Sequence, residues 1–527
     1  MSPPPLSPRD VVKRRWLGFL IWESIASTAL YLLSSLFLSR RPFPLSLLSF
    51  LSFHLSLLLL SLSFFILASP RPEPSASLAE LAKAPFFAPL RGELRRRVRR
   101  ALDAALFAAL CCASGFLAAA AACGDADELV DARRLLGLGL RGSVFGLVFG
   151  IQYLYRKRWV LRFPIIQRPL FYSFKMGLPS SIKRAVKLSI RALFCSFILM
   201  LFLPKEFKGK RTIGRHIIQQ IKFFIGTFTV SLCWEISHHL LQVVHTRRCI
   251  FAPLQGSAAA ETNPSKILLE TLEQSSPRSL LQYLAYLDLC MVSESNLERW
   301  RRAAFFEETG ETYRRVVNAC LRPLEQLASK LAEGLEGFYV DKADFLSQQL
   351  NPPLDIHVQS RLFETFNDFQ LSTWCARTLA ALTARSHWED CYGVAQLTGS
   401  NADVVSTLLS SLLAVEACLG KKTNPQPAGF LGPASIRWAT AGTGRKESIT
   451  AIASKTRGFA LQGNAYAMAD VLRTSIYQVV SAFHADMQAN LKASVLEKNW
   501  ISEGKPLFGT RPVLVQKLCL FLQYNAV

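Results

Sequence analysis

Histidine and glutamate side chains gather near the end of one long apolar run. Glu235 and His238 are spaced i, i+3, and His239 and His245 follow them. On a helix this spacing places a Glu–His pair on one face, as in di-iron bundles, but such sites need a second pair and carboxylates from other helices. The sequence has no second pair and no HExxH motif. We therefore expect no metal site and interpret the cluster as a polar helix end at a membrane interface.

A second candidate for chemistry is the glycine-rich stretch 442–448, GTGRKES. It lacks the GxxxxGK[ST] spacing of a phosphate loop, and no apolar strand precedes it. The sequence also lacks a GxSxG elbow and any CxxC pair. These patterns favour a protein that is not an enzyme and needs no cofactor.

The charge of the chain is divided very unevenly between its two halves. The 527 residues carry a net charge of +23. Residues 1–248 hold 35 Lys and Arg against 12 Asp and Glu, whereas residues 249–527 hold 26 of each. The basic half also holds the longest apolar runs. Cations interleaved with apolar runs indicate a membrane protein, whereas a nucleic-acid binder shows a basic patch on a globular domain. We expect no direct contact with nucleic acid.

The apolar runs of the basic half are long enough to cross a bilayer, which takes about 20 residues per helix. We predict six membrane helices, at residues 17–38, 45–68, 101–122, 135–155, 186–203 and 217–241. An N-terminal arm, 1–16, precedes them, and the membrane domain extends over 17–248. A Pro/Gly/Ser/Ala-rich linker, 249–265, leads to a domain at 266–527.

The positive-inside rule gives the orientation of these helices. The N-terminal arm carries four basic residues, and the loops 69–100 and 156–185 carry eight each. The opposite loops 39–44 and 123–134 carry two each, although 204–216 carries five. This distribution predicts that both termini and the C-terminal domain lie on the cytosolic side.

The densest basic run lies just before the third predicted helix and comprises Arg95, Arg96, Arg97, Arg99 and Arg100. Two interpretations stay open for it. The run can simply enforce topology, or it can bind anionic lipid headgroups, each cation contributing about 1 kcal/mol near the surface.

Polar and small residues inside the predicted helices have separate meanings. Lys187, Lys222 and Glu235 lie near helix ends, so we expect them to snorkel to the interface. Glu23 lies deeper and could pair with an arginine. The fourth helix has two overlapping GxxxG units, which favour close packing against a neighbour, most simply in the same chain. The glycines are Gly142, Gly146 and Gly150.

Helical periodicity dominates the charge-neutral C-terminal half. The longest apolar stripe runs over 465–495, and the tail 512–522 is apolar as well. We therefore predict an all-α, polytopic membrane protein with a mostly helical cytosolic interaction domain.

Within that domain the residues resemble a known signature. It extends over 283–321, reads LAY-x-DL, RR, F, G, W and CL, and is typical of the nuclear division cycle protein 1 family. The matching residues here are Tyr286, Asp288, Leu289, Arg301, Arg302, Phe305, Gly310, Tyr313, Cys320 and Leu321. Tyr313 stands where the family often has Trp, and Thr309-Gly310 replaces a Pro-Gly-Gly. The spacing suggests a helix–helix core, so we interpret the signature as structural.

The resemblance, supported by six spans with both ends cytosolic, implies a structural transmembrane nucleoporin. Such a protein anchors nuclear pore complexes in the nuclear envelope and supports their assembly. Its C-terminal domain would bind inner-ring nucleoporins and a WD-repeat nucleoporin, and its loops could contact anionic lipids. Two alternatives stay open. A transporter or channel would show inverted repeats or helices broken at matching positions. A membrane-bound lipid enzyme would need a histidine–carboxylate motif.

Overall fold

The computed structural model describes residues 8–38, 45–71, 92–124, 132–202, 213–253, 256–344, 365–420 and 449–524. Within these ranges the protein is helical and contains no strand; one parallel bridge joins Ser69 to Val160. The predicted all-α class is confirmed. The glycine-rich stretch 442–448 lies outside the described residues. Contacts divide the chain into two units, Met1–Arg248 with Arg278–Leu280, and Cys249–Pro277 with Leu281–Val527.

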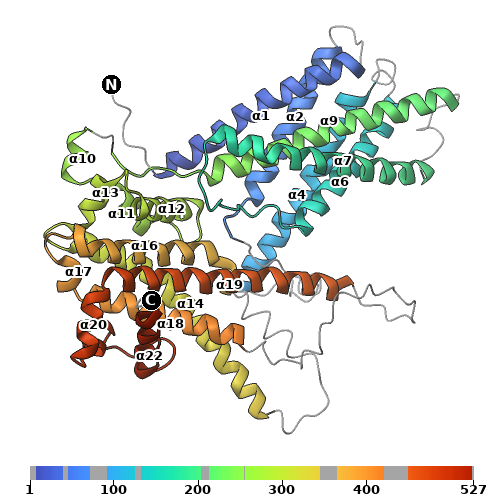
Figure 1. Cartoon of the computed structure of the whole chain (residues 1–527). Coiled ribbons are helices and arrows are strands. Elements are labelled where there is room, and N and C mark those ends of the chain that lie inside the picture. The colour runs from blue at the N-terminus through green and yellow to red at the C-terminus, as the bar shows by residue number, and fades with distance from the viewer. Residues whose placement is uncertain are drawn as a thin grey trace, which may run out of the picture. The chain divides into compact units, whose positions relative to one another are not determined.

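The first unit, called the membrane unit below, is a bundle of long apolar helices, coloured blue to green in Figure 1. They are α1 (Pro8–Leu38), α2 (Leu45–Leu67), α4 (Gly92–Cys123), α6 (Ala132–Tyr155), α7 (Leu170–Phe202) and α9 (Ile213–Thr246). Each is long and apolar enough to cross a membrane. Their outward faces expose leucine, isoleucine and phenylalanine, whereas their inward faces bury serine, alanine and aromatic rings. Exposed apolar side chains around a bundle are what lipid-facing helices require.

Several of these helices are longer than the sequence indicates. The fifth predicted span, 186–203, is the last part of α7, which begins at Leu170, and α9 extends past 241 to Thr246. A hydropathy pattern records only the apolar part of a helix. The polar turns that continue it into the interface carry no hydropathy signal.

Two buried charges of the bundle, Glu23 and Arg141, are hydrogen-bonded to serine side chains. A Glu23–Arg pair, which the sequence left open, is absent among the described residues; instead the Ser61 hydroxyl donates to the Glu23 carboxylate. Arg141 donates a hydrogen bond from Nε to Ser196 Oγ at 2.6 Å. Its guanidinium carbon lies 3.7 Å from the centroid of the Phe223 ring. The contact partner depends on helix packing, which hydropathy does not encode.

The second unit, also called the C-terminal unit below, begins with short helices. The segment 249–265, expected to be a linker, contains the one-turn helix α10 (Ala258–Thr262). It is followed by α11 (Lys266–Gln274), α12 (Leu280–Glu294), α13 (Arg299–Ala303) and η1 (Ala304–Phe306). The central helices are α14 (Glu311–Asp344), η2 (Thr365–Asp368), α16 (Phe369–Glu389), α17 (Val394–Leu397) and α18 (Ser400–Gly420). The last are α19 (Ile449–Ala482), α20 (His484–Lys492), α21 (Leu496–Trp500) and α22 (Arg511–Tyr524).

The core of this unit lies between α14, α16, α18 and α19, which pack against one another (Figure 1). Helix α18 is also long and apolar enough to span a membrane. Most of its apolar side chains are buried against its neighbours, and Leu408, Leu409 and Leu412 are fully buried. We therefore treat α18 as a core helix, since all-round hydrophobicity is equally typical of a helix in the middle of a domain.

The end of the chain packs onto the same unit. The apolar stripe over 465–495 is not one helix, because α19 ends at Ala482 and α20 begins at His484. The tail forms α22, whose Leu514, Leu518 and Leu522 are buried. This helix contacts α18, α19, α20 and α21, so the tail is docked on its own domain.

Candidate functional site

In the membrane unit, glycines of α4 and α6 bring the backbones of these two helices into close contact. A Cβ atom at Gly142 would overlap the carbonyl oxygen of Gly115, and one at Gly146 would overlap the carbonyl oxygen of Cys111. Gly150 is looser, because its nearest neighbour would be Cys111 Cβ at 3.5 Å. The contact lies within one chain. Gly142 and Gly146 let the two backbones touch, whereas Gly150 leaves room for a methyl group.

The membrane unit brings several chain segments together at one end of the bundle. In α1, Arg15 donates to the carbonyl oxygens of Val244 at 2.8 Å and His245 at 2.9 Å, at the last turn of α9. After α2, the Ser69 carbonyl accepts from the Leu161 N–H at 2.9 Å. The N-terminal arm, the loops after α2 and α6 and the end of α9 therefore share one end of the bundle.

A buried ion cluster fastens this end to the helices. Glu235 of α9 is 1% exposed and accepts two parallel hydrogen bonds of 2.6 Å from Arg158. Arg184 of α7 donates from Nε to the same carboxylate at 2.9 Å. The expectation that Glu235 snorkels is therefore wrong, because two guanidinium groups neutralise it inside the protein. The cluster ties the loop after α6 to α7 and α9.

The arginine run at the start of α4 lies at the same end. Arg95 and Arg99 are exposed. Arg100 lies over the ring of Trp159 with its guanidinium carbon 5.7 Å from the ring centroid, a cation–π geometry. The side chains of Arg96 and Arg97 lie outside the described residues. Arg95 and Arg99 thus have the exposure that a headgroup contact needs, whereas Arg100 packs against the protein.

Three histidines in the second half of α9 contact different partners. His238 packs against aromatic rings of α2 and α6. His239 lies with Nε2 3.0 Å from the carbonyl oxygen of Phe174, and the His245 ring lies 4.5 Å from the ring of Trp16. Among the described residues no group of three or more His, Cys, Asp or Glu side chains is arranged to hold a metal ion. These histidines fasten α9 to its neighbours.

In the second unit, the signature residues Asp288 and Arg301 form a buried ion pair. The Asp288 carboxylate, on α12, is 0% exposed and accepts from Arg301 Nη2 at 2.7 Å. It also accepts from the backbone N–H of Phe251 at 2.9 Å, and the Phe251 carbonyl accepts from Arg301 at 3.3 Å. This pair therefore fixes the start of the unit to α12 and α13.

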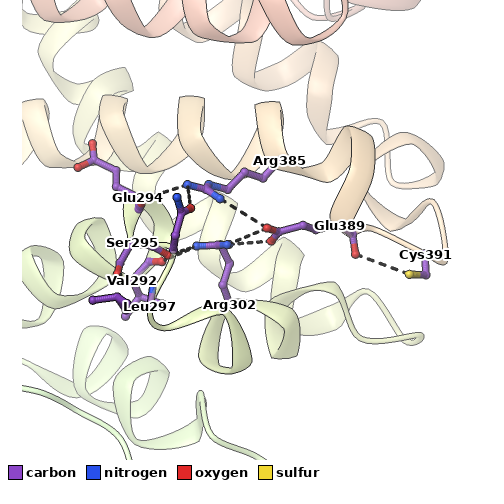
Figure 2. Close-up of polar contacts among 9 residues, drawn as sticks. Val292, Glu294, Ser295, Leu297, Arg302, Arg385, Glu389 and Cys391 are labelled. Carbon is purple, nitrogen blue, oxygen red and sulfur yellow. Dashed lines mark hydrogen bonds and ion pairs between the residues drawn. The ribbon is translucent and has the colours of Figure 1, made fainter.

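The neighbouring Arg302 joins three parts of the same unit (Figure 2). Its guanidinium makes two hydrogen bonds of 2.7 Å to Glu389 at the end of α16. It also donates to the carbonyl oxygens of Val292, in the last turn of α12, and of Ser295, just after that helix. Arg385 completes the network by donating to the Glu294 carbonyl at 2.9 Å. A planar fork with several acceptors is a geometry that arginine satisfies and lysine does not.

The remaining signature residues lie in the interior. Leu289, Phe305, Tyr313, Cys320 and Leu321 are all buried. The Tyr286 hydroxyl donates to the Ala319 carbonyl at 2.9 Å, joining α12 to α14. Gly310 has φ +68° in the turn before α14, a conformation that glycine adopts without strain. All ten residues thus sit where they hold α12, α13 and α14 together.

Two titratable groups of this core, Cys290 and Tyr313, are poorly suited to chemistry. Burial raises the pKa of the Cys290 thiol to about 12, and burial raises the pKa of the Tyr313 hydroxyl to about 12. A reactive cysteine needs the opposite, a pKa lowered by nearby positive charge. Cys290 and Tyr313 therefore behave as packing residues at neutral pH.

Several of the partners were not apparent from the sequence. Arg158 and Glu235 lie 77 residues apart, and Arg302 and Glu389 lie 87 apart. Gly115 of α4 carries no GxxxG unit that would have marked it. The sequence does carry one signal: a charged residue within an apolar stretch indicates that the residue has a buried polar partner. The signal does not identify which residue that partner is.

A comparison with known families matches residues 26–349 to the family model described as nucleoporin protein Ndc1-Nup. The chain belongs to this family. The matched range extends from α1 through α14 and contains both the membrane helices and the buried signature of the second unit. No curated protein matches the chain in sequence.

The family resemblance drawn from the signature residues is therefore confirmed. The Ndc1-Nup family is one of transmembrane nucleoporins, and it is structural rather than enzymatic. The chain is accordingly a membrane protein of the nuclear pore. The region after 349, which includes α16, α18 and α19, lies beyond the family match.

Proposed function

We propose that this chain anchors the nuclear pore complex in the nuclear envelope and supports pore assembly through its C-terminal unit. The observation that carries the proposal is the combination of a lipid-facing helical bundle with a separate, ion-paired helical unit in one chain. The bundle anchors the chain in the membrane, and the second unit provides a rigid surface that binds soluble nucleoporins. In this way the chain contributes to nucleocytoplasmic transport of protein and mRNA.

The partners we propose are inner-ring and WD-repeat nucleoporins, bound by exposed apolar residues near the Arg302 network. Leu297 is 94% exposed and Trp388 is 61% exposed. Arg385 hydrogen-bonds Asn296 at 2.9 Å, which places the turn holding Leu297 beside the last turns of α16. Exposed tryptophan and leucine on a rigid support are typical anchors of a protein interface.

Affinity purification from nuclear envelopes tests this role. The full chain should recover inner-ring and WD-repeat nucleoporins, and a chain lacking 266–527 should not. A variant with Leu297→Ser and Trp388→Ser should lose most of the recovery. A matched variant with Tyr466→Ser and Tyr477→Ser, which are also exposed on this unit, should keep it. Recovery by the truncated chain would move the scaffold role to the membrane unit.

Localisation provides an independent check. A tagged full-length chain should give a punctate nuclear rim. A purely reticular or plasma-membrane pattern would contradict the anchoring role.

We also propose that the basic end of the bundle, marked by Arg15, Arg95, Arg99 and Arg158, faces the cytosol and the pore. The positive-inside rule supports this orientation. A glycosylation acceptor inserted in 125–131 should then be modified, because that loop faces the lumen. An acceptor inserted in 162–169 should stay unmodified, and the reverse pattern would overturn the orientation.

For the arginine run itself we propose contact with anionic headgroups through Arg95 and Arg99. Arg95→Gln with Arg99→Gln should reduce the number of phosphatidylserine molecules retained per chain while leaving the glycosylation pattern unchanged. A changed glycosylation pattern with unchanged lipid retention would show that the run only sets topology.

A further inference from the structure

A pocket lies at the basic end of the membrane unit, between the loop that precedes α7 and the end of α9. Its volume is about 460 Å³. Its walls come from the loop 162–168, the first turns of α7 and the last turn of α9. All of these belong to the same unit of the chain. The pocket has no part in the scaffold role proposed for the second unit.

The charged side chains that line the pocket are all cationic. They are Arg162, Arg168 and Arg247, and no carboxylate lies among the lining residues. All three are exposed. In the part of the chain that the structure describes, none of the three guanidinium groups pairs with a carboxylate; Arg168 contacts the Met176 sulfur. Three guanidinium groups at one pocket form a site for an anion with several acceptor oxygens, such as a phosphate.

The loop that carries two of these arginines is fastened by glutamines. The side-chain amide of Gln242, on α9, accepts a hydrogen bond from the backbone N–H of Arg162 at 3.0 Å and donates one to the Val160 carbonyl at 3.1 Å. The side-chain oxygen of Gln167 accepts a hydrogen bond from the backbone N–H of Arg248 at 3.2 Å. Because amide side chains hold the backbone of the loop, the guanidinium groups stay available. The pocket is therefore formed before any ligand arrives.

The other wall of the pocket is apolar and open. Ile165 is 89% exposed, Ile166 is 67% exposed and Met176 is 63% exposed. Next to them on α7, the aromatic side chains of Phe171 and Tyr172 are also exposed. Exposed aliphatic side chains next to a cationic site are unfavourable in water but suit a boundary between headgroups and acyl chains, where aromatic residues also gather.

The depth of the pocket agrees with this boundary. It is lined by Leu170, in the turns of α7 that precede the apolar span at 186–203, and by Thr246, in the turn of α9 that follows the apolar span at 217–241. Both walls thus lie just beyond the apolar part of a membrane helix, which places the pocket at headgroup level.

We propose that this pocket binds one anionic phospholipid. The headgroup phosphate contacts Arg162, Arg168 and Arg247, and an acyl chain lies along Ile165 and Ile166. Charge complementarity selects the anion, and the apolar wall selects a lipid over a soluble phosphate. The site is separate from Arg95 and Arg99 of α4, which do not line the pocket.

Native mass spectrometry of the full chain tests the site. The protein is released from mild detergent in the presence of equimolar phosphatidylcholine and phosphatidylserine, and the two bound populations are compared. We expect the intact chain to retain phosphatidylserine preferentially. The triple variant Arg162→Gln, Arg168→Gln and Arg247→Gln should lose roughly a hundredfold of that preference, given about fivefold per cation near the surface.

A matched control removes the same charge at the same end of the protein. Arg156, Lys175 and Lys183 are exposed and do not line the pocket. Changing all three to glutamine should reduce the preference much less than the pocket variant does, because these cations do not contact a headgroup bound in the pocket. An equal loss in the two triple variants would show diffuse attraction and would overturn the pocket.

Two further arms separate the remaining outcomes. Replacing the three pocket arginines by lysine keeps the charge, so this variant should retain most of the preference even if the glutamine variant folds poorly. Glycerophosphoserine, which has the headgroup without acyl chains, should not displace the bound lipid at millimolar concentration. Displacement would identify a site for soluble phosphate compounds and would overturn a phospholipid.

Discussion

The guanidinium of Arg302 and the carboxylate of Glu389 face each other through two parallel hydrogen bonds of 2.7 Å. The two side chains are 1% and 8% exposed. They lie 87 residues apart in sequence, so the pair closes a long loop that contains α14. Because this bidentate contact is buried, the stability of the C-terminal unit depends on Arg302, a residue of the family signature.

Replacing Arg302 should therefore destabilise this unit strongly. Arg302→Gln leaves Glu389 partly buried without its main partner, and breaking a buried pair costs about 3–5 kcal/mol. Arg314→Gln, which removes an exposed pair with Glu311, should cost less than about 1 kcal/mol. Hydrogen exchange of α12 and α16 in the full chain measures both. Equal protection in the two variants would contradict the structural role of Arg302.

The same pair predicts a dependence on pH. Burial alone raises the pKa of Glu389, but the hydrogen bond from Arg302 and the charges of Arg302 and Arg385 outweigh it, so the pKa lies below its ordinary value of 4.5. The pair therefore stabilises the folded unit fully above about pH 4.5, and this contribution is lost as the pH falls through the lower folded-state pKa.

The measurement is the difference in unfolding free energy between the intact chain and Glu389→Gln. This difference should be constant from pH 7 to about 5 and should shrink on further acidification. A difference that grew as the pH fell would mean that the pKa of Glu389 is raised in the folded protein.

The glycine contact between α4 and α6 predicts a position-dependent effect of a single methyl group. Gly146→Ala forces a Cβ against the Cys111 carbonyl and should destabilise the membrane unit by about 1–3 kcal/mol. Gly150→Ala meets its nearest atom at 3.5 Å and should be nearly neutral. Thermal unfolding of the detergent-solubilised chain, followed by size-exclusion chromatography, compares them. A larger loss for Gly150→Ala would show that the two helices pack in another register.

Glu235 gives a prediction for the membrane unit as a whole. Glu235→Gln leaves the guanidinium of Arg158, which is 10% exposed, without its carboxylate. We expect a loss of about 3–5 kcal/mol and increased protease cleavage in the loop 156–169. The double variant Glu235→Gln with Arg158→Gln should recover part of the stability, because the only guanidinium of the cluster that then lacks the carboxylate is that of Arg184, which is 33% exposed. Failure to recover would indicate that Arg184 is the more important partner.

The sequence indicates the membrane helices and the family signature for physical reasons. Lipid-facing residues such as Leu48, Leu58 and Phe65 must be apolar, so the spans appear directly as hydropathy. The signature residues Asp288, Arg301 and Arg302 are close in sequence because they lie on α12 and α13, which are consecutive.

What the sequence does not indicate is which distant residues meet. Glu235 has an apolar neighbourhood in the chain and an ionic one in space, since Arg158 arrives from a loop and Arg184 from another helix. The apolar composition of α18 equally fits a span and a core helix, and its packing against α14 and α19 distinguishes them. The pocket near Arg247 likewise needs three segments to be brought together.

The contact of Arg15 with the last turn of α9 has a consequence for the order of biosynthesis. Arg15 leaves the ribosome 229 residues before Val244, a delay of roughly 10–50 s at about 5–20 residues per second. During that time α1 is already in the membrane while its partner has not been made. The guanidinium can close onto the Val244 and His245 carbonyls only after the final membrane helix is inserted. This contact is therefore a late event that separates a completed membrane unit from every partly translated one.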